Sequence, residues 1–192
     1  MDLPLDLAAL RAAVAGGRSF GYRLFYGHRA RDDGQLSDSV FSQWWPCRFA
    51  EGGQLYTSAE QFMMAGKARL FGDGDRLADI AATDDPAACK ALGRRVAGFD
   101  EARWQGARFD LVTRGSAAKF RGEPLRAYLL ATGEDILVEA SPRDRIWGIG
   151  LGRASEAARD PRTWRGQNLL GFALVRARAI LRGELPLPDA QV

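Results

Sequence analysis

The sequence of 192 residues contains little histidine and little cysteine: one histidine, His28, and two cysteines, Cys47 and Cys89. A histidine-based catalytic triad therefore depends on His28 alone, and a metal site made of several histidines is excluded. The cysteines form no CxxC pair and no even disulfide framework, so we expect them to be packing residues. A reducing cytoplasm is the expected compartment. Any catalysis is expected to depend on carboxylates, lysine or arginine.

Long apolar runs and a strong charge imbalance are also missing. No run approaches the roughly 18 residues that a membrane-spanning helix needs. The first residues, MDLPLDLAALRAAVAGG, carry acids early and lack the basic start of a signal peptide. The 27 Lys and Arg residues only slightly outnumber the 24 Asp and Glu residues, which is too small an excess to indicate duplex nucleic-acid binding. A few arginines at one pocket would suit a phosphorylated small molecule better.

The length and the hydrophobic periodicity predict one mostly helical α+β domain with a small β-sheet. Residues 20–183 are expected to form the domain, preceded by an N-terminal helical extension (1–19) and followed by a tail (184–192). The predicted helices cover residues 5–15, 58–70, 74–82, 86–97, 100–119, 123–132 and 166–182. The predicted strands cover residues 20–28, a hairpin within 47–58, and a short buried segment around 137–138.

The helix predicted from Ser58 places four side chains on one face. Glu60, Met63, Met64 and Lys67 stand at offsets 0, 3, 4 and 7. One interpretation is an amphipathic helix whose charges flank a methionine patch of the core, and spacing alone favours it. The other is a helix that lines a pocket, with methionines as its floor and the two charged groups reaching a ligand.

The segment SPRDRIWGIGLGR (141–153) combines a carboxylate, a large aromatic ring and several glycines. For Asp144 and Trp147 taken singly, an Asp-initiated turn before a buried tryptophan is the favoured interpretation. The glycines at 148, 150 and 152 also permit a ligand to approach the backbone closely. Neither GxGxxG spacing nor a Walker lysine is present, so a phosphate loop is not indicated.

Basic and aromatic residues supply weaker candidates. Arginines occur in predicted loops or helix ends at positions 29, 31, 94, 95, 143 and 145, where most arginines are simply solvated. The aromatic run FSQWWP (41–46), which includes Trp44, is either a stacking wall for a base or part of the core. His28, which follows a strand, is most often a structural histidine in such a position.

Taken in order, these motifs resemble the YbiA-like family, also called the NADAR superfamily, over roughly residues 22–182. The segments that carry the resemblance are FYGHR (25–29), FSQWWPCRF (41–49), YTSAEQFMMAGKARLFGD (56–73), ALGRRVAGFD (91–100), Trp104, KF (119–120), LLATGEDILVEASPRDRIWGIGL (129–151) and WRGQNLLGFAL (164–174). The blocks 56–73 and 129–151 together are the most specific part of it.

The resemblance implies an N-glycosidase fold and pocket, with cleavage of a C1′–N bond between a ribose and a nitrogenous base. One activity of the family acts on ribosylaminopyrimidine phosphates, intermediates of riboflavin biosynthesis. Another branch removes ADP-ribose from modified guanine in toxin–antitoxin and immunity systems. By position, the family's glutamate, lysine, aspartate and tryptophan fall on Glu60, Lys67, Asp144 and Trp147.

The sequence departs from the family pattern at two places. Gln43 stands where many relatives have Asn, and TSAEQ (57–61) replaces a TSEH-like motif of the YbiA branch. The AEQ form indicates a branch different from the riboflavin-linked enzymes, which leaves the substrate open between the two activities. A third hypothesis is a catalytically silent module that binds ADP-ribose or NAD, but such a module would not need the acid-and-lysine set.

The expected chemistry follows from the charge that develops during N-glycoside hydrolysis. Positive charge grows at the anomeric carbon and negative charge on the departing base, so Glu60 and Asp144, from different segments, could flank the bond. Lys67 could form a Schiff base with an opened sugar or only bind phosphate. No metal and no cofactor are implied. The expected substrate contacts are Tyr26, Gly27, His28, Arg29, Trp44, Met64, Arg94, Trp104, Trp147, Gly148 and Asn168, with Arg94 favoured for phosphate.

Overall fold

The structure is a computed structural model that describes residues 3–189. Residues 1–2 of the expected extension and 190–192 of the expected tail lie outside the described part. The helices are α1 (Leu7–Ala15), α2 (Ala59–Leu70), α3 (Gly74–Ala81), α4 (Pro86–Gly93), α5 (Glu101–Lys119), α6 (Leu125–Leu130) and α7 (Leu169–Leu181). The strands are β1 (Tyr22–Phe25), β2 (Phe49–Glu51), β3 (Gln54–Tyr56) and β4 (Ile136–Glu139). Short 3-10 helices cover Asp38–Phe41, Glu156–Arg159 and Pro161–Thr163. The predicted mostly helical α+β class is confirmed.

Side-chain caps fix where several helices begin. The Ser58 hydroxyl accepts a hydrogen bond from the Gln61 N–H at 3.1 Å, as the sequence predicts for the start of α2. The carboxylates of Asp85 and Asp100 cap α4 and α5 in the same way, and Pro86 occupies the first turn of α4. Each cap satisfies a backbone donor that the first helical turn leaves free.

Three helices are four residues shorter than predicted, and the one expected over 123–132 spans only Leu125–Leu130. The helix expected over 166–182 begins only at Leu169, because Asn168 has a left-handed backbone (φ 55°). Its amide holds that conformation: Nδ2 donates to the Leu137 carbonyl and Oδ1 accepts from the Glu139 N–H, both at 2.9 Å. The helix expected over 86–97 ends at Gly93, whose carbonyl accepts from Lys67 Nζ at 2.8 Å.

The strands form two separate two-stranded sheets rather than one small sheet. β1 pairs in parallel with β4, from Tyr22 opposite Ile136 to Phe25 opposite Glu139. β2 and β3 form the predicted antiparallel hairpin, and Gly52 and Gly53 turn the chain with φ values of 59° and 76°. The strand predicted over 20–28 ends at Phe25, so the chain from residue 26 onward is loop.

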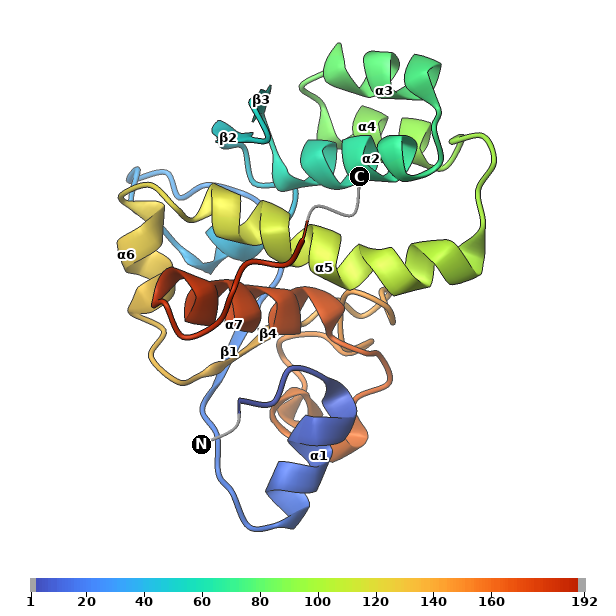
Figure 1. Cartoon of the computed structure of the whole chain (residues 1–192). Helices are drawn as coiled ribbons and strands as arrows, with labels where there is room; N and C mark the ends of the chain where they lie inside the picture. Colours follow the sequence, from blue (N-terminus) through green and yellow to red (C-terminus); the bar gives the residue numbers. More distant parts are fainter. Residues whose placement is uncertain (1–2, 190–192) are drawn as a thin grey trace.

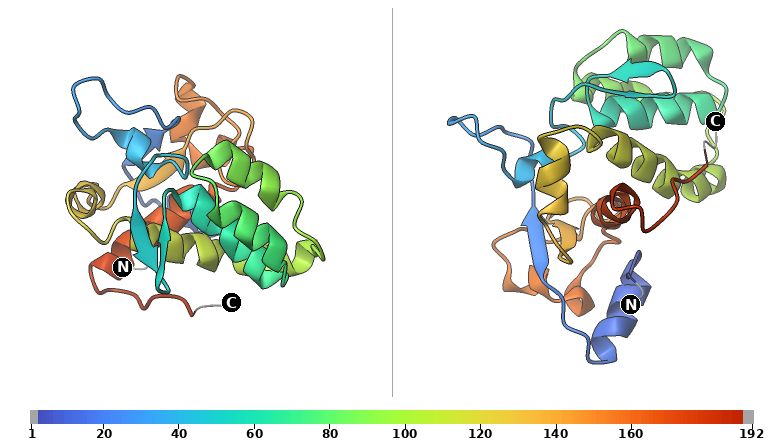
Figure 2. Two further views of the ribbon diagram at one scale, coloured as in Figure 1. Left: turned by 90° about the horizontal axis from the view of Figure 1, so that it is seen from above. Right: turned by 60° about the vertical axis from the view of Figure 1, so that its left-hand side comes forward.

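The helices pack in layers over the parallel strand pair. Helix α7 contacts β4 on one side and α5 on the other, and α5 in turn packs against α2 (Figure 1). Helices α2, α3 and α4 form a group at one end of the molecule, while α1 lies at the opposite end (Figure 2). Arg11 of α1 donates to the carbonyls of Pro161 and Trp164, at 2.9 and 3.0 Å, which attaches the N-terminal helix to the domain.

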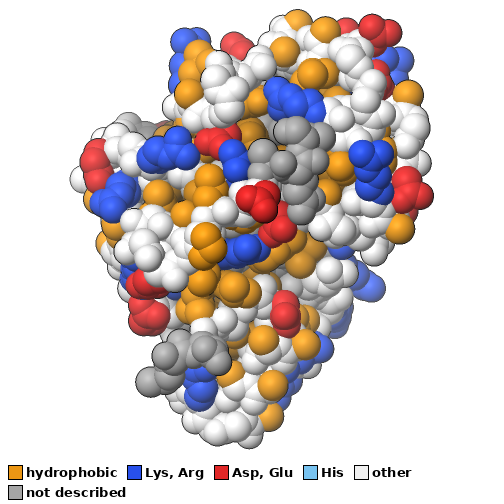
Figure 3. Space-filling model, viewed as in Figure 1, with side chains coloured by type: hydrophobic (Ala, Val, Ile, Leu, Met, Phe, Trp, Pro, Cys, Tyr) orange, Lys and Arg blue, Asp and Glu red, His pale blue; other side chains and the backbone are white. Residues whose placement is uncertain are grey.

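The surface agrees with the small net charge of the sequence. On the face drawn in Figure 3, acidic and basic side chains are interspersed and neither sign forms a continuous patch. Within residues 3–189, no helix has both the length and the apolar character required to cross a membrane.

Candidate active site

The α2 face predicted from spacing lines a cavity of about 170 Å³ between α2, α4, α5 and the end of β4. Both interpretations of its methionines hold at once, because Met63 and Met64 belong to the hydrophobic core and also face the cavity. The complete lining is Ser42, Gln43, Trp44, Glu60, Met63, Met64, Lys67, Lys90, Gly93, Arg94, Trp104, Glu139, Asp144, Trp147 and Leu170. The structure therefore brings Glu60, Lys67 and Asp144 together with five of the expected substrate contacts.

Glu60 is the most deeply buried carboxylate of this cavity. Its side chain lies in the first turn of α2, the residue is 3% exposed, and Oε1 has no hydrogen-bond partner among the described residues. Burial raises the pKa of Glu60 to about 7, and the charge of Asp144 also raises it. The charges of Lys90 and Arg94 lower this pKa, as does a hydrogen bond from Trp44. Glu60 can therefore exchange a proton near neutral pH, as general acid–base catalysis requires.

Asp144 fixes the backbone of Trp147, whose side chain forms part of the cavity wall. Its Oδ1 accepts hydrogen bonds from the N–H groups of Ile146 and Trp147, both at 2.8 Å, so it forms the Asp-initiated turn that the sequence suggests. Oδ2 takes no part in this turn, and both Asp144 and Trp147 line the cavity. The turn interpretation and the pocket interpretation are thus compatible.

Lys67 reaches the same cavity from the next turns of α2. Its Nζ lies 2.8 Å from the Gly93 carbonyl oxygen, 4.1 Å from the centre of the Phe99 ring and 5.6 Å from that of Trp104. Burial lowers the pKa of Lys67, and the charge of Glu101 raises it in part. A lowered pKa increases the fraction of neutral amine, which is the nucleophilic form.

Two charged residues of the cavity were not identified by the sequence analysis. Glu139, the last residue of β4, and Lys90, on α4, both line the cavity. A carboxylate that directly follows the buried residues 136–138 is a signal that could have identified Glu139. Lys90 stands four residues before Arg94, a spacing that places both on one side of the helix end.

Two expected substrate contacts lie outside the cavity lining. Asn168 is fully buried, and its side-chain amide forms hydrogen bonds with the backbone of β4. Gly148 is required by packing, because a Cβ there would lie 2.8 Å from the Glu139 carbonyl oxygen and 2.9 Å from Ser141 Cβ. Both residues support the wall that carries Glu139 and Asp144.

The remaining expected contacts, Tyr26, Gly27, His28 and Arg29, line a second, more open cavity of about 630 Å³. They follow the carboxyl end of β1, next to the end of β4. Arg31 and Arg153 also line this basic cavity. It adjoins the first cavity through an aromatic contact, since the ring centres of His28 and Trp44 are 5.5 Å apart.

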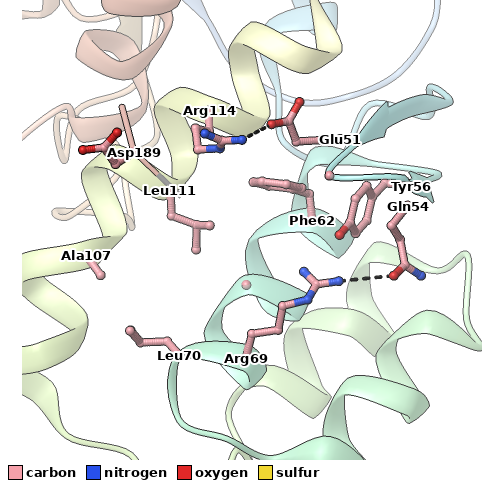
Figure 4. A pocket seen from close by; sticks show the side chains of 12 residues that line it. Glu51, Gln54, Tyr56, Phe62, Arg69, Leu70, Ala107, Leu111, Arg114 and Asp189 are labelled. Carbon is pink, nitrogen blue, oxygen red and sulfur yellow. Dashed lines mark hydrogen bonds and ion pairs between the residues drawn. The ribbon is translucent and has the colours of Figure 1, made fainter. Parts of the chain in front are cut away.

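A third cavity, of about 260 Å³, lies on the other face of α2 and contains none of the candidate residues (Figure 4). Phe62 and Leu70 of α2 and Leu111 of α5 form its apolar wall, and Arg114 pairs with Glu51 at its edge. Helix α2 therefore separates this cavity, which is also lined by Glu51, Arg69 and Asp189, from the cavity that holds Glu60 and Lys67. Within residues 3–189, no group of three or more His, Cys, Asp or Glu side chains is arranged to hold a metal ion.

Several known proteins are similar to this chain in sequence or in fold. The family model for the NADAR domain matches residues 24–182. The chain is 43% identical over 164 residues to "N-glycosidase R617" of Acanthamoeba polyphaga mimivirus, a match that covers 82% of this chain and 94% of that protein. It is 32% identical over 117 residues to "Riboflavin biosynthesis protein PYRR, chloroplastic" of Zea mays, covering 58% of this chain and 17% of that protein.

The fold has a solved counterpart in the NMR structure of the E. coli protein YbiA. The two structures agree with a TM-score of 0.67 at 25% sequence identity, over 87% of this chain and 88% of that one. This agreement confirms the expected YbiA-like fold. With a family model that spans residues 24–182 and a relative 43% identical over 164 residues, the chain belongs to the NADAR family.

Proposed function

We propose that this NADAR protein hydrolyses the C1′–N bond between a phosphorylated ribose and a nitrogenous base, with ribosylaminopyrimidine phosphates as its substrate class. The enzyme class, a hydrolase of N-glycosyl bonds, rests on the 43% identity to an N-glycosidase over most of the chain. The observation that carries the proposal is the cavity itself, which places carboxylates, a lysine and tryptophan rings around one small space.

The cavity suits a reaction in which charge separates along the C1′–N bond. A carboxylate such as Asp144 or Glu60 stabilises the positive charge that grows at C1′. Glu60, with a pKa near neutrality, takes the proton of the attacking water. The rings of Trp44 and Trp147 offer flat faces for the base, which holds the bond close to these groups.

The phosphate has two candidate binding regions. Arg94 and Lys90 lie in the small cavity itself, whereas Arg29, Arg31 and Arg153 line the adjoining basic cavity. The small cavity, at about 170 Å³, falls below the roughly 300–1,000 Å³ of most ligand pockets. A nucleotide-sized substrate would therefore place its base–ribose junction in the small cavity and extend into the basic one.

The surroundings of Lys67 also support a covalent route. In this route the sugar ring opens to an imine between C1′ and the base nitrogen, the Lys67 amine adds to C1′, and both amine protons pass to the base nitrogen as its bond to C1′ breaks. Water then hydrolyses the Lys67 imine to free lysine and sugar. Borohydride reduces an imine to a stable adduct, so trapping during turnover followed by mass spectrometry tests this route. A reduced sugar adduct at Lys67 is expected on the covalent route, and its absence under turnover would leave direct attack by water.

The basic cavity gives one reason to consider a second substrate, ADP-ribose attached to guanine, because a diphosphate would pair with its arginines. The name of the maize relative favours the first substrate class. The deciding experiment measures base release, as kcat/KM, from a ribosylaminopyrimidine phosphate and from ADP-ribosylated guanosine. We expect the first to be cleaved with the higher kcat/KM. Binding of ADP-ribose with no release from either substrate would instead indicate a silent binding module.

A further inference from the structure

Glu139 occupies a rigidly held position at the wall of the small cavity. It is the last residue of β4, and its backbone N–H donates to Asn168 Oδ1 at 2.9 Å. Its carbonyl oxygen accepts from the N–H groups of Ser141 and Ile149, at 2.9 and 3.0 Å. The strand, the start of α7 and the loop that carries Asp144 therefore fix this residue together. Such immobilisation is typical of groups that must be positioned precisely for a reaction.

Glu139 is partly buried, and one oxygen of its carboxyl group has no hydrogen-bond partner among the described residues. Its Oε2 atom is buried and forms no hydrogen bond with any described residue, although a buried polar group normally has a partner. Five charged groups line the cavity around it: Glu60 and Lys67 from α2, Lys90 and Arg94 from α4 and its cap, and Asp144 from the following loop. An unpartnered carboxyl oxygen that lines this cavity is available to the part of a ligand that enters it.

The neighbouring charges decide which buried carboxyl keeps a proton. Two buried carboxyls in one cavity do not both ionise readily, because each charge disfavours the other. Lys90, Trp44 and Arg94 all favour the ionised form of Glu60, whereas among them only Lys90 does so for Glu139. Burial, Asp144 and Glu60 raise the pKa of Glu139 to about 8. At neutral pH, Glu139 is therefore mostly protonated, and Glu60 is ionised in a larger fraction of molecules than Glu139 is.

We propose that Glu139 is the general acid of the reaction and protonates the base as it departs. The inference rests on the proposed cleavage of a C1′–N bond and holds for either substrate class. The Glu139 Oε–H proton moves to the base nitrogen while the C1′–N electron pair passes to that nitrogen. Water supplies the oxygen that bonds to C1′, and its proton goes to Glu60. Solvent then returns a proton to Glu139 and removes one from Glu60.

A pair of leaving groups tests this role. The change Glu139→Gln keeps the size of the side chain and removes its acidic proton. The first substrate is the ribosylaminopyrimidine phosphate, whose base needs protonation to leave. The second is 4-nitrophenyl ribofuranoside 5-phosphate, whose nitrophenolate leaves without a proton. We expect kcat/KM of the variant to fall by about 10²–10⁴-fold on the first substrate, and by less than about 10-fold on the second.

Two results would overturn the assignment. An equal loss on both substrates would show that Glu139 only positions other groups, and unchanged activity on the first substrate would show that it is not needed. A wild-type protein that cleaves neither substrate would instead contradict the proposed function. Glu134→Gln is the matched control, because Glu134 is an exposed carboxylate paired with Arg182, away from the cavity.

The pH profile and an infrared measurement add independent readouts. Activity of the wild type on the first substrate should fall as pH rises through about 8, because Glu139 loses its proton there, and the variant should lack this step. The infrared spectrum of the wild type at pH 7 should contain a protonated carboxyl band that Glu139→Gln strongly weakens, leaving the contribution of Glu60, whose pKa is about 7. Wild-type protein without that band would contradict the proposal whether or not the variant folds.

Discussion

Replacement of Glu60 by Gln should stabilise the protein at high pH while it impairs the reaction. The pKa of Glu60 rises from 4.5 to about 7 in the folded protein, mainly because the side chain is buried. Below pH 4.5 the group is protonated in both folded and unfolded chains, so burial costs no ionisation energy. Above pH 7 it is ionised in both, and the folded protein bears the full cost of a buried charge.

The size of this cost follows from the pKa difference. Each tenfold change in proton affinity is worth about 1.4 kcal/mol, so a pKa raised from 4.5 to about 7 corresponds to about 3 kcal/mol at pH 9. Glu60→Gln should therefore exceed the wild type in free energy of unfolding by about 3 kcal/mol at pH 9, and by little at pH 4.5. Loss of the charge beside Glu139 adds to the gain.

Urea denaturation at several pH values between 4.5 and 9, followed by circular dichroism, measures this difference. In a thermal melt the same energy corresponds to roughly 6–12 °C for a chain of this size. Glu134→Gln is the control of opposite sign, because Arg182 holds the pKa of exposed Glu134 below its usual value. A difference between Glu60→Gln and wild type that does not grow with pH would refute the reasoning.

Three further predictions follow from other parts of the structure. Lys119 is buried, and burial lowers its pKa from 10.5 to about 8. At pH 6 the folded protein therefore buries a charge, and Lys119→Met should be more stable than wild type in urea denaturation. This advantage should disappear as pH rises from 8 towards 10.5, because the lysine becomes neutral. Gly171→Ala should destabilise the fold by about 1–3 kcal/mol in the same assay, because its Cβ would lie 2.0 Å from the Leu137 carbonyl oxygen. Trp147→Ala should raise KM about fivefold in steady-state assays, through loss of a stacking face worth about 1 kcal/mol.

Local signals were sufficient to predict the helix that carries two of the candidate catalytic residues. The cap at Ser58 and the spacing of Glu60, Met64 and Lys67 identify both α2 and the face that lines the cavity. Residues three or four apart lie on the same face of any α-helix, so this arrangement does not depend on distant contacts. The turn at Asp144 was predictable for the same reason, since it depends on only a few consecutive residues.

Features that depend on distant contacts could not be predicted. Asn168 adopts a left-handed backbone because its amide bonds to β4, some thirty residues earlier in the chain, and this shortens α7. The sequence suggested that Gly148 lets a ligand approach the backbone, but the glycine is needed for close packing against the Glu139 carbonyl. Glu139 lines the cavity only because β4 lies near α2 and α4; the local pattern shows a carboxylate after a buried strand but not which helices it faces.

The basic cavity shows the same limit. Tyr26, Gly27, His28 and Arg29 were expected to contact substrate beside Glu60, but they line a separate, adjoining cavity. β1 ends at Phe25, opposite Glu139, so these residues lie in the loop that follows the paired ends of the two strands. Sequence order alone placed these residues correctly near the site, without showing that Trp44 and His28 separate the two spaces.

An N-glycosyl bond hydrolysed in the cavity of Glu60, Lys67, Glu139 and Asp144 makes the rate of base release depend on Glu60. That rate is measured at pH 7 for wild type, Glu60→Gln and Glu134→Gln. We expect equal rates for wild type and Glu134→Gln, and a rate lower by about 10²-fold or more for folded Glu60→Gln. Base release by Glu60→Gln at the wild-type rate would show that the bond is not hydrolysed in this cavity.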